Sequence, residues 1–422
     1  MKRKYPAFPK REIPNFALIQ QRLRNDHIAD PRKDVCEKLL AAGLAQKVKL
    51  GSRVAITAGS RGFGGFIPLL EGIIAAVKCL GGLPLIIPSM GSHGSATTEG
   101  QAELLRSLGV DEKSAPIEAT MDTIALGKSE TGAVAHLDAI AAKADGIIVM
   151  GRVKMHAQNT EGIGSGLLKM TTVGLGKQKG AQEAHNNGLW RSIRAVSKIT
   201  LAHAKVHCGV AILENAFCQP VVVEVVPGTF EAFEEADKRL LVVSKDHFAK
   251  IPFQQLDVLV VDEIGKNISG SGMDLNVVGK WRVSGGEQKP DFRRIVVLSL
   301  TRESCGNGLG VGIADFTTER FVKDFDQIAT YVNIFTSTER GTMGQRKGSL
   351  PLALPNDREA MQVALYSSQA GVNSRICRIK NTANLSQMWV SEGLLEEAKS
   401  NPQLIILDQL KPLPFDSSGN LF

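Results

Sequence analysis

Three histidines and one lysine occupy glycine-rich stretches of the sequence, where core packing gives no reason for such side chains. They are His93, His156, Lys169 and His185. Imidazole, with a pKa of about 6.5 when unperturbed, acts as a base or an acid near neutral pH, and in its neutral form it also binds metals. A lysine amine serves as a nucleophile or as a cation for an anionic group. Singly each residue is a weak indication, but together they predict a functional site.

A glycine-rich loop at residues 59–65 follows the β-branched stretch 53–57 and precedes an apolar helical stretch. Glycines at such a turn let the backbone approach an anion at the N-terminus of the helix, and Arg61 is available to pair with that anion. The loop therefore predicts a contact with a phosphate or a carboxylate, with a plain tight turn as the alternative.

Two nucleotide-binding motifs are excluded by the residues themselves. Short-chain dehydrogenases start with a related glycine motif but need a Tyr-x-x-x-Lys pair, and no tyrosine of this chain is followed four residues later by lysine. The glycine runs 162–169 and 174–178 do not fit the Gly-x-x-x-x-Gly-Lys-Ser/Thr loop of nucleoside triphosphatases.

The elements that must position these residues alternate between buried strands and helices, which indicates an α/β protein with mostly parallel sheets. The expected strands are residues 53–57, 83–88, 146–151, 206–213, 221–226, 256–265 and 294–300. The expected helices are residues 34–46, 69–80, 97–108, 230–241 and 392–400. Weak periodicity between residues 245 and 255 places a boundary near residue 250. We therefore expect two α/β domains, 1–250 and 251–422.

The composition is that of a folded chain. Of 422 residues, 43% are apolar and 22% are charged, which excludes disorder over the whole length. The net charge of +7 favours anionic partners such as small acids, nucleotides or nucleic acid. No secretory signal or membrane span is expected, because the basic residues 1–11 lack an apolar run and the apolar window 66–88 contains charged residues and glycines. The six scattered cysteines form no Cys-x-x-Cys pair, so we expect reduced thiols and a cytoplasmic protein.

Over roughly residues 53–280, and more weakly beyond, the sequence resembles the nickel-pincer lactate racemase family and its 2-hydroxy-acid racemase and epimerase relatives. The resemblance rests on residues 91–94 (GSHG), His156, residues 164–169 (GSGLLK) and His185. The spacing of 16 residues between Lys169 and His185 matches the family. The spacing of 13 residues between His156 and Lys169 is a few residues longer than in the lactate enzyme.

This resemblance implies a cofactor derived from nicotinic acid mononucleotide, in which sulfur-containing substituents hold nickel in a pincer. Lys169 falls on the lysine that is joined covalently to the cofactor, and His185 falls on the histidine that completes the nickel site. Imidazole suits the tetragonal coordination of nickel(II). Ser165 and Gly166 fall in the cofactor-binding run, and Arg61 falls on an arginine near the cofactor phosphate or the substrate carboxylate.

His93 and His156 fall on the acid/base pair of the family. The implied reaction is racemisation or C2-epimerisation of a 2-hydroxy acid by reversible hydride transfer to the cofactor, with the histidines moving the hydroxyl proton. This route avoids abstraction of the weakly acidic proton beside the carboxylate. The resemblance also implies an active site in the cleft between the two domains. The expected partners are a small anionic 2-hydroxy acid and the proteins that synthesise the cofactor, but neither nucleic acid nor a membrane.

Residues 272–282 depart from the family pattern. Gly279 stands where the lactate enzyme has a glutamine, and Lys280 or Arg282 replaces its substrate-binding lysine. The smaller residue leaves room for a larger and more polar acid, so a sugar acid such as an aldonate is favoured over lactate or a malate-like acid. A solvated basic stretch is the alternative interpretation of Lys280 and Arg282.

Two other functions stay open. A non-catalytic α/β protein that binds the cofactor or a nucleotide would keep Lys169 and His185 but differ in the residues that bind substrate. A nucleic-acid-binding protein is supported only by the net charge, since aromatic residues make up 5% of the chain and no reading motif is present.

Overall fold

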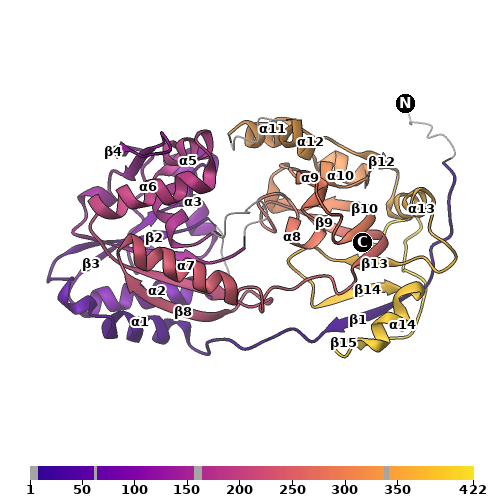
Figure 1. Cartoon of the computed structure of the whole chain (residues 1–422), viewed down its shortest axis with the longest axis horizontal. Helices are drawn as coiled ribbons and strands as arrows, with labels where there is room; N and C mark the ends of the chain where they lie inside the picture. Colours follow the sequence, from indigo (N-terminus) through magenta and orange to yellow (C-terminus); the bar gives the residue numbers. More distant parts are fainter. Residues whose placement is uncertain (1–7, 61–63, 156–163, 337–341) are drawn as a thin grey trace. The chain divides into compact units, whose positions relative to one another are not determined.

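The computed structural model describes residues 8–60, 64–155, 164–336 and 342–422 (Figure 1). The chain divides into two compact units. The central unit is Arg24–Phe248, and the split unit combines Met1–Leu23 with Ala249–Phe422. The chain therefore begins in the split unit, forms the central unit, and returns. Within the described ranges no helix is both long and apolar enough to cross a membrane.

A five-stranded sheet in the order β3-β2-β6-β7-β8 forms the middle of the central unit. The strands are β2 Arg53–Ala58, β3 Leu83–Pro88, β6 Gly146–Arg152, β7 Val206–Glu214 and β8 Pro220–Pro227. The first four strands in the sheet order are parallel, and β8 is antiparallel to β7. Each agrees with an expected strand within about two residues, and the predicted α/β class with mostly parallel pairing is confirmed.

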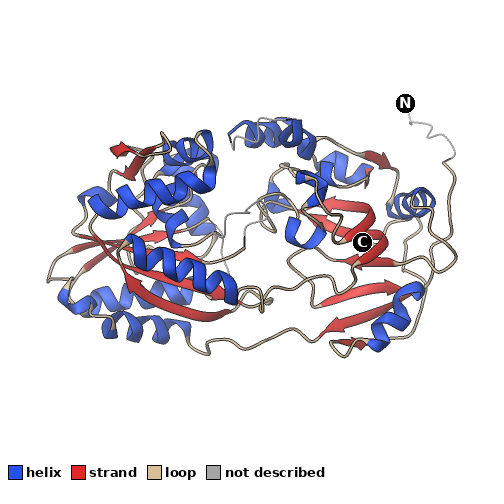
Figure 2. Ribbon diagram, viewed as in Figure 1, coloured by secondary structure: helices blue, strands red, loops and turns tan. Residues whose placement is uncertain are grey.

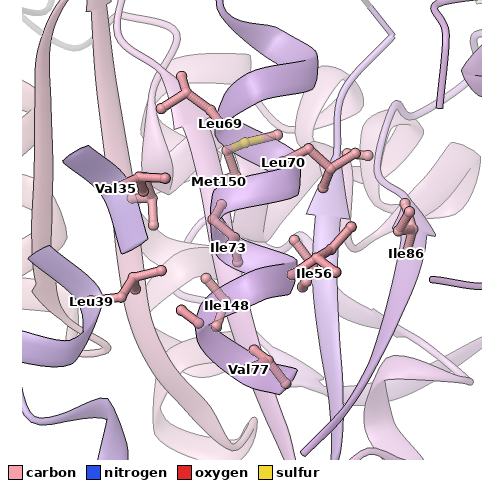
Figure 3. Close-up of a cluster of buried hydrophobic side chains, with 14 of the residues drawn as sticks. Val35, Leu39, Ile56, Leu69, Leu70, Ile73, Val77, Ile86, Ile148 and Met150 are labelled. Carbon is pink, nitrogen blue, oxygen red and sulfur yellow. The ribbon is translucent and has the colours of Figure 1, made fainter. Parts of the chain in front are cut away.

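Two hydrophobic cores lie on opposite faces of this sheet, because successive strand side chains point to opposite faces. Ile56 and Ile148 belong to a core formed with the first two helices (Figure 3), whereas Ala55 and Ile147 belong to a core formed with later helices. Burial on both faces explains why these strands are continuous apolar runs. The helices are α1 Pro31–Ala41, α2 Phe66–Cys79, α3 Thr98–Ser107, α5 Lys177–Asn186, α6 Leu189–His203 and α7 Phe230–Val243.

The passage between β6 and α6 contains more helix than its glycines suggest. A short helix, α4 Leu167–Lys169, continues into a π-helix, Met170–Gly174, and then into α5. A hairpin of β4 Thr123–Lys128 and β5 Val134–Asp138 forms a separate two-stranded sheet of this unit.

The split unit contains an eight-stranded mixed sheet in the order β12-β11-β10-β9-β13-β14-β1-β15. Strands are red and helices blue in Figure 2. Its strands are β1 Phe16–Gln21, β9 Gln255–Ile264, β10 Asp291–Leu300, β11 Phe316–Thr318, β12 Leu352–Leu354, β13 Ile376–Ile379, β14 Gln387–Ser391 and β15 Leu404–Ile406. The helices are α8 Leu275–Val278, α9 Trp281–Ser284, α10 Glu319–Asp324, α11 Gln327–Thr336, α12 Thr342–Gly348, α13 Asp357–Ser367 and α14 Glu392–Ser400. From β12 to β13 the strands are parallel, and the last three are added antiparallel. β1 was not expected from the polar N-terminal sequence.

Gly72 of α2 lies against α1, where no side chain fits. A Cβ at this position would lie 2.3 Å from the carbonyl oxygen of Arg32 and 2.4 Å from Cγ1 of Val35. We expect Gly72→Ala to lower the free energy of unfolding by about 2 kcal/mol, because overpacking outweighs the higher helix propensity of alanine. Urea unfolding measures this loss. Gly59→Ala is the control, since nothing lies within 4 Å of a Cβ there; equal stability of the two variants would contradict the close packing.

Candidate functional site

The carboxyl ends of β2, β3 and β6 lie along one edge of the central unit's sheet, because these strands are parallel. Open α/β sheets bind ligands at this edge. The segments that follow these strands carry the predicted residues Arg61, His93 and His156, and then Ser165 and Gly166. Arg61 and His156 lie outside the described residues.

His93 lies on an exposed loop whose backbone is held by a buried glutamine. Gln101 of α3 donates from Nε2 to the carbonyl oxygens of Gly91 at 2.9 Å and of His93 at 3.1 Å. The loop also fits closely on the start of α3, since a Cβ at Gly94 would lie 2.7 Å from the carbonyl oxygen of Gly100. The fold therefore fixes the backbone of His93 and leaves its imidazole exposed.

Lys169 is the last residue of α4, and α4 starts just after an isolated antiparallel β-bridge. Ser165 and Lys154 form this bridge with backbone hydrogen bonds of 2.9 and 3.0 Å. Nζ of Lys169 lies 3.4 Å from Oγ of Ser165, one helical turn earlier, and the lysine side chain is half-buried. The predicted cofactor residues Ser165, Gly166 and Lys169 thus form one continuous segment at the carboxyl edge.

A buried carboxylate caps the start of this segment. Asp237 of α7 accepts hydrogen bonds from the backbone N–H groups of Leu167 at 2.9 Å and Leu168 at 3.0 Å. Gly166 is needed beside it, because a Cβ there would lie 2.2 Å from Oδ1 of Asp237. Burial raises the pKa of Asp237 to about 6, and the two N–H donors oppose the rise. The carboxylate satisfies donors that a helix start leaves unpaired, and it fixes the backbone that leads to Lys169.

The π-helix after Lys169 is held by buried hydroxyl groups. Oγ1 of Thr171 and Oγ1 of Thr172 each lie 2.9 Å from Oγ of Ser197 on α6. Ser197 also donates to the carbonyl oxygen of Leu168 at 2.9 Å. Such π-helical turns are frequent at functional sites. The network attaches the segment that carries Lys169 to α6.

The loop of His93 packs directly on this helical segment. A Cβ at Gly91 would lie 3.1 Å from Cγ1 of Val173, and a Cβ at Gly174 would lie 3.1 Å from the carbonyl oxygen of Ser89. Glycine at both positions therefore lets the two backbones approach each other.

The buried side chain of Lys177 connects α5 to β5 and to the end of β3. Lys177, the first residue of α5, places Nζ 2.8 Å from Oδ2 of Asp138 on β5, and both side chains are fully buried. The same amine donates to the carbonyl oxygen of Pro88, at the end of β3. Burial lowers the pKa of Lys177, and Asp138 opposes this effect. His185, half-buried, follows on the same helix, so these contacts bring together the segments of His93, Lys169 and His185.

The two predicted substrate residues of the split unit have different surroundings. Arg282 on α9 lies 3.1 Å from both Oδ2 of Asp315 and the carbonyl oxygen of Ile313, and its side chain is 8% exposed. Burial lowers the pKa of Arg282, and Asp315 opposes this effect. Lys280 is half-buried and precedes α9 directly. Gly279 has a φ of +105°, which favours glycine. The hydrogen bonds of Arg282 thus go to residues of its own unit.

Four buried polar residues that support this edge were not predicted from the sequence: Gln101, Asp138, Lys177 and Asp237. A signal exists for Asp237, because it lies four residues after Phe233 and three before Leu240, on the core-facing side of an amphipathic helix. A carboxylate at such a position needs hydrogen-bond donors. No sequence pattern around Lys177 indicates burial.

No protein-family model matches this chain, and no curated protein matches it. Among solved structures, it is similar to the lactate racemase apoprotein from Thermoanaerobacterium thermosaccharolyticum, with 12% identity and a TM-score of 0.52 over 88% of this chain and 99% of that chain. A crystal structure of a protein from Thermotoga maritima matches 64% of this chain and 71% of its own, with 12% identity and a TM-score of 0.49. The first likeness shows a shared fold.

The cap formed by Asp237 predicts a specific pH dependence. Its pKa is raised from 3.8 to about 6 in the native state, so the folded protein binds this proton more tightly than the unfolded chain does. This residue therefore makes stability fall as pH rises through that window. Between pH 4 and pH 7 we expect the free energy of unfolding of Asp237→Asn to gain about 2 kcal/mol relative to the wild type. Urea unfolding across this range measures the difference, with the exposed Asp246→Asn as control; parallel curves for Asp237→Asn and the wild type would rule out the shift.

Proposed function

We propose that the chain is a racemase or C2-epimerase of 2-hydroxy acids that carries a nickel-pincer nucleotide on Lys169. The observation on which this rests is the fold shared with the lactate racemase apoprotein over 88% of the chain. The packing of the His93 loop on the segment of Lys169 and His185, at the ligand-binding edge of the sheet, supports the same function.

The protein's side chains suit a metal whose ligands come mostly from a cofactor. In the part of the chain that the structure describes, no group of three or more His, Cys, Asp or Glu side chains is placed to hold a metal ion. A pincer cofactor supplies sulfur donors of its own, so one imidazole is enough to complete a tetragonal nickel site. His185 is the proposed nickel ligand.

Lys169 is the proposed point of covalent attachment. Its backbone belongs to a helical segment whose start is fixed by hydrogen bonds to Asp237, so the fold holds the base of the lysine side chain in place. Ser165 and Gly166 precede it and would contact the cofactor, while Arg61 would bind a phosphate or a carboxylate. Proteins that synthesise the cofactor would be the partners that load it.

Proton transfer is the proposed task of His93 and His156. When bound, the pincer nucleotide supplies a hydride acceptor for the substrate carbon. The histidines would take the hydroxyl proton and return it, and inversion requires that they flank the substrate. The exposed imidazole of His93 on a fixed backbone suits this task.

The proposed substrate is a small anionic 2-hydroxy acid. Arg282 directs hydrogen-bond donors at Asp315 and at backbone carbonyl groups, which leaves Lys280 as the better contact for a carboxylate or a hydroxyl group. Gly279, which replaces a glutamine of the lactate enzyme, favours a larger and more polar acid than lactate, such as an aldonate.

Attachment of the cofactor is tested by intact mass and metal content. In a host that loads a known lactate racemase, we expect a mass increase that maps to Lys169 and nickel near one equivalent, because an amine nucleophile at this position is required for the linkage. Lys169→Arg keeps the charge and should abolish the mass increase, whereas Lys179→Arg, on an exposed position of α5, should retain it. An unmodified wild type in such a host would contradict the proposal and favour a protein that does not carry this cofactor.

The role of His93 is tested separately from cofactor loading. His93→Ala should keep the added mass and the nickel but slow inversion at C2 of the substrate by at least about 100-fold, the usual contribution of a general acid or base. His203→Ala, at an exposed position of α6, is the matched control. Inversion is followed by chiral chromatography for lactate and by NMR for gluconate, whose C2 epimer is a distinct diastereomer. Undiminished inversion in His93→Ala would exclude this histidine from proton transfer.

A further inference from the structure

Glu214, the last residue of β7, has one carboxylate oxygen with a partner and one without. Its side chain is 10% exposed, and one of its oxygens, Oε2, lies 2.7 Å from a guanidinium nitrogen of Arg152. The other oxygen, Oε1, is buried and has no hydrogen-bond partner among the described residues. Buried polar atoms are nearly always satisfied in native proteins, so an unpaired carboxylate oxygen calls for a ligand or another donor.

Glu214 lies at the ligand-binding edge of the sheet. Arg152 ends β6, which is parallel to β7, so both residues stand at carboxyl ends of neighbouring strands. Two residues after Arg152, Lys154 pairs with Ser165, and that pairing leads to Lys169. Glu214 is therefore next to the start of the segment that carries the proposed cofactor residues.

The turn that follows Glu214 is fixed against the glycine-rich loop of β2. Asn215 accepts hydrogen bonds from the backbone N–H groups of Phe217 at 2.9 Å and Gln219 at 3.0 Å. The N–H group of Gly64 donates to the carbonyl oxygen of Cys218 at 2.9 Å. The end of β7 is thus tied to the loop after β2, and the position of Glu214 is set from both sides.

The charges around Glu214 favour a neutral hydrogen-bond donor as its missing partner. Burial raises the pKa of Glu214, and the nearby cations Arg152 and Lys154 oppose this effect. Two cations already lie near this carboxylate, and an anion would be repelled by the unpaired oxygen. A hydroxyl group satisfies the oxygen without adding charge.

We propose that Oε1 of Glu214 accepts a hydrogen bond from a hydroxyl group of a ligand bound at this edge. The inference rests on the proposed function, which supplies two sources of such a group: the ribose of the nucleotide and the hydroxylated chain of a sugar acid. A site that hydrogen-bonds a hydroxyl group discriminates strongly against the analogue that lacks it, because its own polar group is then left unpaired. Glu214 is therefore a specificity-determining residue.

The test compares probes with and without hydroxyl groups on the full-length protein without cofactor, by isothermal titration calorimetry. The nucleotide pair is nicotinic acid mononucleotide and its 2′,3′-dideoxy analogue, and the acid pair is gluconate and lactate. We expect the wild type to prefer the hydroxylated member of one pair by at least about tenfold. Glu214→Ala should abolish that preference and leave the other pair unchanged, and the affected pair identifies the source of the hydroxyl group.

Control variants separate the hydrogen bond from a folding defect. Glu224→Gln alters another Glu–Arg pair, that with Arg239, and should keep the preference. Arg152→Met with Glu214→Leu removes the acceptor without leaving an unpaired guanidinium, and should also lose the preference if Glu214→Ala fails to fold.

Two results would overturn the inference: a preference that survives removal of Glu214, or a wild type that binds neither hydroxylated probe more tightly than its analogue. Either result leaves the attachment of a cofactor to Lys169 untouched. Conversely, a preference that depends on Glu214 in a protein that never takes up nickel or mass would contradict the proposed function alone.

Discussion

The ion pair between Lys177 and Asp138 is the interaction on which the arrangement of this edge depends. Both side chains are fully buried, and the lysine amine also donates to the carbonyl oxygen at the end of β3. Removing one partner of such a pair costs about 3–5 kcal/mol, because a buried charge is left uncompensated. The pair therefore holds three elements together: the strand that leads to His93, the hairpin strand β5, and the helix that carries His185.

The segment of Lys169 combines a backbone fixed by hydrogen bonds with a lysine side chain that is half-buried. Its start is capped by Asp237, and the turn that follows is fixed by hydroxyl groups of Thr171, Thr172 and Ser197. A buried backbone group without a partner costs free energy, and here the hydroxyl groups of Thr171 and Ser197 both donate to the carbonyl oxygen of Leu168. A site that orients a reacting group needs this kind of support from residues that never touch the ligand.

The sequence predicted the five strands of the central unit's main sheet well, because most of them are buried on both faces and are therefore largely apolar runs. The hairpin strands β4 and β5 were not predicted. β3 and α14 agree with the expected limits at both ends. β1 was missed because its strand character comes from pairing with Ser391 and its neighbours, far away along the chain, and not from local pattern. In the candidate site, the loop position of His93 followed from the strand pattern. Lys169 was expected in a glycine-rich loop but lies at the end of helix α4. The burial of Lys177 depends on a partner in a hairpin that no local signal connects to it.

The carboxylate partners of the buried cations also change what the net charge predicts about ligand binding. A charge of +7 predicts attraction of anions on average. Several of the cations are buried against carboxylates, however: Lys177 against Asp138, Arg282 against Asp315, and Arg378 against Asp262 at 2.7 Å. Each of these cations is paired with a carboxylate inside the fold, so these groups build the fold and do not attract ligands. The cations able to select an anionic ligand are therefore those that the fold leaves partly exposed. Lys280 is half-buried and is one of these, whereas Arg282, two residues later, is paired with Asp315.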